Sequence, residues 1–322
     1  MKKRLFKGVV GALILCIGSV GIAAGIEAKE ARRGQDIERV SHTAGEVDFF
    51  LRLAPGATFP TEIRNHGEAT VEEDFWIAET PVTYELWYEV KNWAKDNGYE
   101  FAYPGREGSS DLVGEKPTAR RREPVTEVSW YDCVVWTNAL SEFLGYEPVY
   151  TQNGEVVRNA GEIFYEGVEV RDRGGFRLPT SPEWELAARY KGSDSSHGAI
   201  EYPENSGKYW TSGNYASGAT DDYRNPVATG EAAWYIANSG ERTRAVGQKP
   251  HLGNWLGLFD MSGNVSEWCF TSYDEKRILR GGSWNYSSPQ LAGFSLQVGF
   301  VRSIAPSYAV PLIGFRVVRT DL

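Results

Sequence analysis

Three stretches in the last quarter of the chain decide its fold. They read GLFDMSGNVSEWC at Gly257–Cys269, RILRGGSWNYSS at Arg277–Ser288 and IGFRVVR at Ile313–Arg319. Between the last two the composition changes. Asn285–Leu312 spans 28 positions and holds one charged residue, Arg302, with no Asp, Glu, Lys, Met or Trp, although 24% of the whole chain is charged. A fixed frame therefore surrounds an insert of unusual composition.

Length and composition favour one large folded domain. The 322 residues include 11 Trp and 35 Gly, which predicts an extensive aromatic core with many loops. Leucine-rich helical periodicity is scarce, so we expect an α+β, loop-rich domain and not a helical bundle. The net charge of −9 argues against nucleic acid as a partner.

Residues 1–25 have the pattern of an export signal: a lysine-rich start, an apolar stretch and small residues near Ala24. Cys16 follows Leu-Ile-Leu and is a candidate for lipidation, which would anchor the protein to a membrane; simple cleavage of the signal is the alternative. We therefore expect an exported protein at the cell surface or in the periplasm. Residues 26–46 are polar and aperiodic and predict a flexible tether, with the folded domain running over 47–322.

Capping signals place three helices. The first starts at Pro81–Thr83 and ends at Gly98. The second begins after Ser129, with Asp132 three residues on, and the third is predicted with Ser181 as its cap. Short strands are predicted around 47–59 and 75–77, and hairpins within 149–176. Residues 208–251 predict a long loop that needs buried aromatic residues or a metal to hold it. Outside the signal, the only cysteines, Cys133 and Cys269, are either one disulfide or two buried thiols.

Six motifs, taken in order, resemble one family. They are PVTYELW, PVTEVSWYD, FRLPTSPEWELAAR, GLFDMSGNVSEW, RILRGGSW and IGFRVVR. The chain from Val47 to Leu322 resembles the formylglycine-generating-enzyme (sulfatase-modifying factor) domain, a variant of the C-type-lectin fold. The resemblance implies a compact α+β domain with little regular secondary structure and many ordered loops.

The resemblance also shows what this chain lacks. The enzyme of the family oxidises a substrate cysteine with two cysteines that hold copper, just after the RGGS motif. The matching positions here are Tyr286 and about Leu291, and neither side chain offers the thiolate that copper(I) needs. An iron-dependent branch of the family binds iron through histidines. This chain has four histidines, one of them His42 in the predicted tether, and no two are spaced as metal ligands on a helix would be. We therefore expect no catalytic residues, no copper and no iron. A sulfatase-modifying oxidase with an unfamiliar mechanism stays as the alternative.

A structural calcium site is predicted in the segment from 260 to 267. Two carboxylates flank a turn there, which gives the all-oxygen ligand set that Ca²⁺ prefers. The family resemblance implies ligation by the side chains of Asp260 and Glu267 and by the carbonyls of Gly263 and Val265. A capped turn without metal is the alternative. A second site in GNYASGATDDY would use Asn214 and Asp222.

The insert has a codon signature. If only the adenines of an A-A-pyrimidine codon change, Asn can become most residue types but not Lys, Glu, Gln, Met or Trp. The insert is filled with the reachable types, and only Gln290 and Gln297 fall outside them. This pattern resembles the variable region of proteins diversified by a retroelement, among them variable surface lipoproteins of treponemes that share this fold. The resemblance implies a fixed scaffold that displays a changeable binding surface.

The predicted ligand-binding residues are those of the insert that would be displayed. Their partner would be an unknown protein or glycan at the cell surface. The alternative is that the alternating residues from 294 to 300 form a buried strand in a constant surface or periplasmic protein of unknown partner. The predicted set is Asn285, Tyr286, Ser287, Leu291, Phe294, Leu296, Val298, Phe300, Ile304, Tyr308, Val310 and Leu312.

Overall fold

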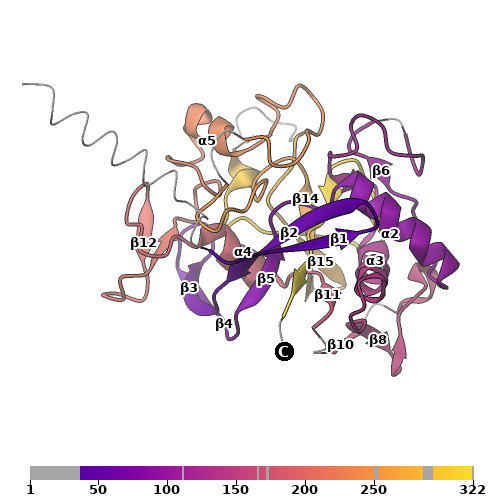
Figure 1. Ribbon diagram of the computed structural model, residues 1–322. Helices are drawn as coiled ribbons and strands as arrows, with labels where there is room; N and C mark the ends of the chain where they lie inside the picture. Colours follow the sequence, from indigo (N-terminus) through magenta and orange to yellow (C-terminus); the bar gives the residue numbers. More distant parts are fainter. Residues whose placement is uncertain are drawn as a thin grey trace, which may run out of the picture.

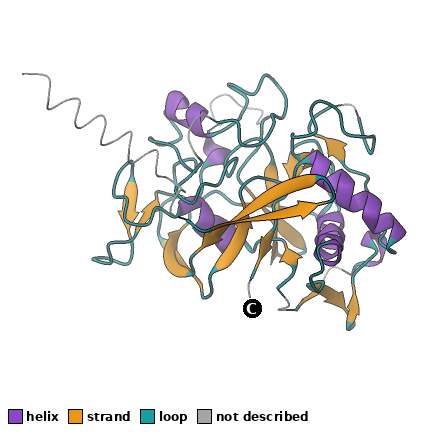
Figure 2. Ribbon diagram, viewed as in Figure 1, coloured by secondary structure: helices purple, strands orange, loops and turns teal. Residues whose placement is uncertain are grey.

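The computed structural model describes residues 37–110, 112–164, 167–171, 174–249, 253–285 and 293–320. Within these residues, short strands and four α-helices are joined by loops, and Figure 2 shows how much of the chain the loops make up. The α+β, loop-rich fold predicted from the sequence is confirmed. Within the described ranges, no helix is long and apolar enough to cross a membrane.

The central sheet has five strands in the order β1-β2-β5-β18-β11, and it joins the two ends of the chain. Val318 pairs with Ile77, so the last motif of the sequence lies beside the strand at Phe75–Ala78 (Figure 1). The bounds are β1 Arg39–Ala44, β2 Val47–Ala54, β5 Phe75–Ala78, β11 Phe176–Arg177 and β18 Val318–Arg319.

A second sheet carries the three motifs and the insert. Its order is β16-β15-β14-β17, with β17 parallel to β14 and the insert strand β16 at the free edge. The bounds are β14 Ser266–Tyr273, β15 Lys276–Arg280, β16 Arg302–Ile304 and β17 Ile313–Gly314.

The remaining strands form two-stranded and three-stranded ribbons, including the hairpins predicted within 149–176. Their bounds are β3 Ala57–Thr61, β4 Gly67–Val71, β6 Arg106–Glu107, β7 Val125–Thr126, β8 Tyr150–Gln152, β9 Glu155–Val156, β10 Glu169–Val170, β12 Ala199–Glu201 and β13 Tyr209–Thr211. Two short 3-10 helices are η1 Ala160–Glu162 and η2 Phe294–Leu296.

The helices begin near the predicted caps. Helix α2 (Tyr84–Asp96) is capped by Thr83, and α3 (Trp130–Phe143) has a full capping box between Ser129 and Asp132. Helix α4 (Ser181–Arg189) corrects one prediction, because Thr180 is the cap and Ser181 is the first helical residue. Thr180 accepts the backbone N–H of Glu183, whose side chain returns the bond, and this pairing fixes the boundary.

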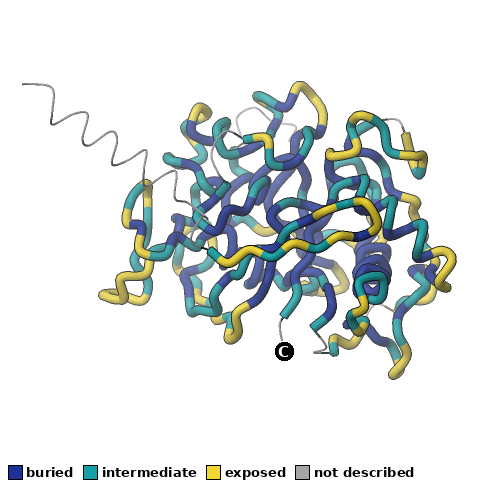
Figure 3. The backbone as a smooth tube through the Cα atoms, viewed as in Figure 1, coloured by how far each residue is buried: buried dark blue, intermediate teal, exposed yellow. Residues whose placement is uncertain are grey.

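Two expectations about irregular segments are wrong. Residues 39–44 of the predicted tether form β1, which pairs along its full length with β2 and lies across the front of the molecule (Figure 3). Exposed and half-buried residues alternate along it up to the buried Ala44. His42 is therefore in a strand and stacks on Phe49 at 5.4 Å. The long loop from 208 to 251 contains a helix, α5 (Pro226–Ala232), capped by Asn225. In both cases pairing or capping outweighed a polar, aperiodic sequence.

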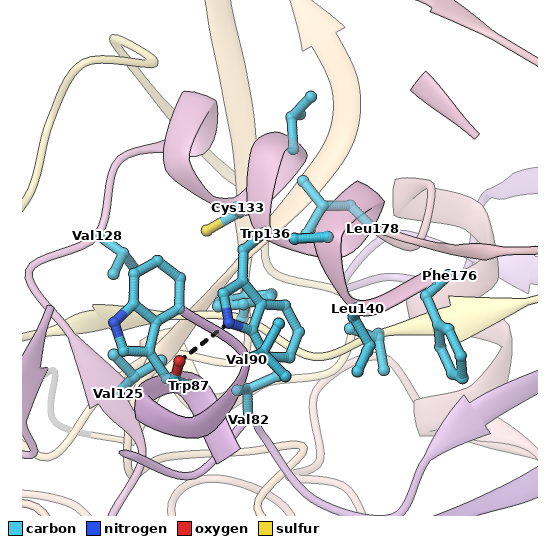
Figure 4. Packing of buried hydrophobic residues seen from close by; sticks show 14 of the residues in the cluster. Val82, Trp87, Val90, Val125, Val128, Cys133, Trp136, Leu140, Phe176 and Leu178 are labelled. Carbon is cyan, nitrogen blue, oxygen red and sulfur yellow. Dashed lines mark hydrogen bonds between the residues drawn. The ribbon is translucent and has the colours of Figure 1, made fainter. Parts of the chain in front are cut away.

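The largest core cluster lies between α2, α3 and the central sheet. Trp87 stacks on Trp136 with ring centres 5.8 Å apart, and Phe315 meets both rings edge-on at 6.1 and 5.3 Å. Trp136 donates its ring N–H to the carbonyl of Trp87 (Figure 4). Cys133 lies in this core as a free thiol, and Cys269 is a second buried free thiol in another cluster. Burial raises the pKa of both thiols, so neither is poised to react.

Candidate functional site

The insert runs from the end of the RGGS motif to β17 of the second sheet. The structure divides its residues into buried and displayed groups. Leu296 and Val298 are fully buried, so their assignment to a ligand-binding surface is wrong. Leu296 packs beside Tyr235, and Val298 belongs to the cluster that contains Trp184. Apolar side chains at these two positions fill the core beneath the insert.

The other predicted binding residues are partly or fully accessible where the structure describes them. Asn285 is exposed and Tyr308 is 49% exposed, whereas Phe294 and Phe300 are half-buried. Three further residues are half-buried with one side against the main core: Ile304, Val310 and Leu312. The predicted positions Tyr286, Ser287 and Leu291, together with the lipidation candidate Cys16, lie outside the described residues.

The alternative of a buried strand from 294 to 300 also does not hold as stated. Residues Phe294–Leu296 form the 3-10 helix η2, so side chains do not alternate between two faces. Sequence reasoning missed Val301, which is 47% exposed, and Arg302, which is exposed at the start of β16. No periodic signal marks them, because they follow a turn and not a regular element.

The insert is held in place through its own backbone carbonyls, which accept hydrogen bonds from the surrounding frame. The guanidinium of Arg280 donates to the carbonyls of Val298 and Phe300 at 3.3 and 3.2 Å, and the hydroxyl of Ser262 donates to the carbonyl of Leu296 at 2.7 Å. The ring N–H of Trp284 donates to the carbonyl of Pro311. Three backbone amides outside the insert also donate to its carbonyls: Trp130 to Pro306, Ser266 to Leu312 and Glu127 to Val310. These bonds do not depend on which side chains the insert carries.

Two amides of the insert donate in the opposite direction. Val298 bonds the carbonyl of Tyr215 at 2.8 Å, and Gly299 bonds that of Gly213 at 3.0 Å. A side chain at Gly299 would collide with the backbone of Glu62, with a Cβ only 2.4 Å from its carbonyl carbon. Gln297 is fully buried and its backbone bridges Ala216. Positions 296 to 299 are therefore part of the frame.

Arg280 is itself held in a buried charge cluster on α4. One carboxylate oxygen of Glu185 accepts from Arg280 at 2.7 Å, and the other accepts from Arg189 at 2.6 Å. Arg280 also donates twice to the hydroxyl of Ser181, at 2.9 and 2.7 Å. Since every donor of this guanidinium has an acceptor, the arginine is rigidly placed beneath the insert.

The predicted calcium segment is arranged around an ion pair. Arg316 binds Glu267 through both carboxylate oxygens, at 2.6 and 2.7 Å, and the ring N–H of Trp184 adds a third bond at 2.8 Å. The charge of Glu267 is thus already neutralised by a side chain. Val265 is fully buried, and Gly263 lies so close to Trp234 that a Cβ would be 2.3 Å from its carbonyl oxygen.

Of the two predicted carboxylate ligands, Asp260 has an oxygen to spare. Its Oδ2 accepts the amide of Gly247 at 2.8 Å, while its Oδ1 is buried without a hydrogen-bond partner among the described residues. Burial raises the pKa of Asp260 to about 6. Across the described ranges, no group of three or more His, Cys, Asp or Glu side chains is placed to hold a metal. Asp260 fits a cation and Glu267 does not, so calcium binding stays a prediction that depends on Asp260.

The weaker second calcium candidate brings its two residues together. The amide of Asn214 lies 3.5 Å from Asp222, and Tyr215 and Asp222 form an isolated antiparallel bridge. Asp222 also accepts the backbone N–H of Arg224 at 2.8 Å. These contacts hold the loop together internally, and the loop borders the insert.

Comparison with known proteins agrees with the motifs and the fold. Residues 28–321 match the sequence profile of the family described as Sulfatase-modifying factor enzyme 1-like domain. The chain belongs to this family. Among curated relatives, Chaperone protein LppX of Paenibacillus barcinonensis is 29% identical over 84% of this chain and 89% of its own length. The Inactive C-alpha-formylglycine-generating enzyme 2 of Mus musculus is 29% identical over 44% of this chain and 42% of its own length.

Solved structures of the family place the chain in the same fold. Treponema denticola variable protein 1 is 28% identical, with a TM-score of 0.64 over 87% of this chain and 98% of that one. CarF is 26% identical, with a TM-score of 0.61 over 88% and 98%. The predicted resemblance to the formylglycine-generating-enzyme fold and to its variable-protein branch is confirmed. The family includes members named as inactive or variable, so membership does not imply catalysis.

Proposed function

We propose that this chain is an exported, non-enzymatic binding protein that displays its C-terminal insert as a changeable surface. The observation that carries the proposal is the backbone support of the insert. Arg280, Ser262 and Trp284 hold its carbonyls, so displayed side chains can change without removing a bond that defines the fold. The similarity to a treponeme variable protein over 98% of that chain supports the same reading.

The buried and displayed positions of the insert differ in the residue types that they carry. Gln297 is one of the two residues that adenine changes in an Asn codon cannot produce, and it lies at a buried frame position. The exposed and half-buried positions, such as Phe294, Phe300 and Tyr308, carry residues that such changes do produce. We infer that the displayed positions are the variable ones and that 296–299 are constrained by packing.

The test compares two sets of substitutions in the purified exported chain. Phe294→Ser, Phe300→Ser and Tyr308→Ser combined should lower the melting temperature only slightly, because these side chains are not enclosed. Leu296→Ala with Val298→Ala is the matched control and should cost about 4 kcal/mol or more, since two buried side chains are truncated. Equal losses in both sets would show that the insert is ordinary core. Sequencing the flanks of the gene for a near-copy of the codons for 285–316 beside a reverse-transcriptase gene tests diversification itself.

The absence of oxidase activity is a separate part of the proposal. It rests on the family's two copper-binding positions, which fall at Tyr286 and about Leu291, since neither residue is a cysteine. Incubation of the protein with copper(I), oxygen and a sulfatase-type cysteine peptide should give no more peptide aldehyde, by mass spectrometry, than copper(I) and oxygen without the protein. A larger yield of aldehyde with the protein would restore the enzymatic alternative.

A second candidate function is assistance to another exported protein. The similarity to a protein named as a chaperone, which this chain matches over 89% of its length, favours it. Such a role would use one constant partner, so the displayed residues would be the same between strains. A diversified surface predicts strain variation confined to the displayed positions, and gene comparison between strains separates the two.

A further inference from the structure

A loop outside the insert lies directly beside it. The carbonyls of Gly213 and Tyr215 accept the amides of Gly299 and Val298, and a Cβ on Gly293 would lie 2.5 Å from the carbonyl oxygen of Tyr223. The loop from 213 to 225 therefore borders one side of the insert from 293 to 299. Any partner that covers this side of the insert also meets the loop.

The loop adds an aromatic ring to the two rings of the insert. Tyr223 meets Phe294 edge-on with ring centres 6.0 Å apart, and Phe294 meets Phe300 edge-on at 5.4 Å. All three side chains are half-buried, so each is held by its neighbours and still presents an open face. We call these three residues the aromatic cluster. Tyr223 is its fixed member, because it lies outside the insert.

The positively charged side chain of Arg224 lies at the edge of the aromatic cluster. The guanidinium of Arg224 lies 5.3 Å from the centre of the Tyr223 ring, and its side chain is 75% exposed. Its ion pair with Asp222 is long at 3.4 Å. Arg302, the single charge of the insert, is exposed two residues beyond Phe300. Arg224 thus places an exposed positive charge beside the rings in a chain whose net charge is −9.

The carboxylates nearby serve the loop itself. Asp221 accepts from the side chain of Asn225 at 2.9 Å and from the amide of Asp222 at 2.8 Å. Asp222 accepts the amide of Arg224 at 2.8 Å. Asp221 is exposed and Asp222 half-buried, but the hydrogen bonds of both carboxylates are made inside the loop. The guanidinium of Arg224, in contrast, is 75% exposed and lies 3.4 Å from Asp222, so it remains accessible to a carboxylate of a partner. An aromatic surface beside such a guanidinium complements a segment of apolar side chains and carboxylates.

We propose that Tyr223 and Arg224 form a fixed contact point at the edge of the changeable surface, and that the partner is a protein segment that combines apolar side chains with carboxylates. The inference rests on the proposed function, since it assumes that the insert binds a partner. The fixed pair supplies an anchor that every version of the insert shares, while the displayed residues of the insert select among acidic partners.

The test uses two synthetic peptides of matched length, the acidic DFEYDLE and the basic KFKYKLK, each with an uncharged dye, in fluorescence-anisotropy titrations with the exported chain. The acidic peptide should bind more tightly, and added salt should weaken it because the contact is ionic. Arg224→Glu and Tyr223→Ala should each weaken binding about tenfold or more. Lys208→Glu, the same charge reversal at an exposed residue of another loop, should leave it unchanged.

Each other outcome decides a different point. Equal binding of both peptides, or no binding of either, would overturn the acidic partner class. Equal effects of Arg224→Glu and Lys208→Glu would overturn the fixed contact point. Loss of binding in Phe294→Ala and Phe300→Ala but not in Tyr223→Ala would leave the proposed function intact and reject the anchor. Binding that none of these variants alters would place the site elsewhere and count against both proposals. Circular-dichroism melting of each variant confirms that it is folded.

Discussion

Arg316 and Glu267 form a two-pronged ion pair in a position that is fully closed to solvent. Their bonds measure 2.6 and 2.7 Å, and both side chains are 0% exposed. Arg316 also donates to the carbonyls of Ala78 and Phe259, so one guanidinium joins three segments of the chain. The motifs GNVSEW and IGFRVVR are thus two halves of one contact.

The first prediction concerns this pair. Arg316→Met leaves the carboxylate of Glu267 buried without its counter-charge, and we expect a loss of about 3 to 5 kcal/mol in the free energy of unfolding. Arg158→Met is the matched control, because the Arg158–Glu142 pair is partly exposed and its loss should cost about 1 kcal/mol or less. Urea unfolding followed by tryptophan fluorescence measures both. Similar losses in the two variants would mean that burial does not govern the strength of these pairs.

The second prediction concerns calcium. If the free Oδ1 of Asp260 helps to hold Ca²⁺, excess calcium should raise the melting temperature of the natural chain, with a gain of about 2.7 kcal/mol at one hundred times the dissociation constant. Asp260→Asn, which keeps the side-chain shape, should reduce that gain. Asp48→Asn removes an exposed carboxylate and serves as control. A calcium effect that is equal in all three proteins would place the ion away from Asp260, and no effect would favour the metal-free turn.

The third prediction separates two arginines that share Glu185. Arg280→Lys cannot reach both insert carbonyls, so amide hydrogen exchange should speed up in 293–302. Arg189→Lys disturbs the same carboxylate but contacts Glu62, Asn65 and Thr211. Exchange in that variant should therefore speed up around 62–65 and 211. If both variants loosen the same peptides, Arg280 has no particular role in holding the insert.

Local signals predicted three of the four described α-helices, because their caps are short-range contacts, but they missed α5. Ser129 and Asp132 are three residues apart and form the capping box that the sequence predicted. The motifs also predicted the fold and the family. β1 escaped prediction because its order comes from β2 and from the bond of Arg39 to Glu79, 40 residues away. No local pattern in a polar stretch reports such a partner.

The candidate site was predictable in composition but not in exposure. Leu296, Val298 and Phe300 are all apolar, yet the first two are buried and the third is half-buried. A 3-10 turn and an ordered loop place them, and neither has a period that a sequence can display. Tyr223 was missed for a different reason. It reaches the site through its contact with Phe294, 71 residues further along the chain, and only the three-dimensional structure brings the two together.

The last prediction concerns a buried lysine. Lys91 on α2 is 1% exposed, and its amine donates to the carbonyl of Pro104 at 2.8 Å. Burial lowers the pKa of Lys91 to about 8, below the model-peptide value of 10.5. The unfolded chain therefore binds more protons between pH 8 and 10.5, so the contribution of Lys91 to stability rises with pH across that window and is constant and unfavourable below it.

Lys91→Met removes this cost, and the carbonyl of Pro104 keeps the ring N–H of Trp87 as a donor at 2.9 Å. We expect the variant to be more stable than the natural chain by up to about 3 kcal/mol at pH 7, with the difference shrinking as the pH rises from 8 to 10.5. Lys95→Met, on the exposed side of the same helix, should change stability by about 0.5 kcal/mol or less at every pH. Urea unfolding at pH 7, 8.5 and 10 measures the trend. A Lys91→Met difference that stays constant with pH would show that packing and not ionisation sets the cost of this lysine.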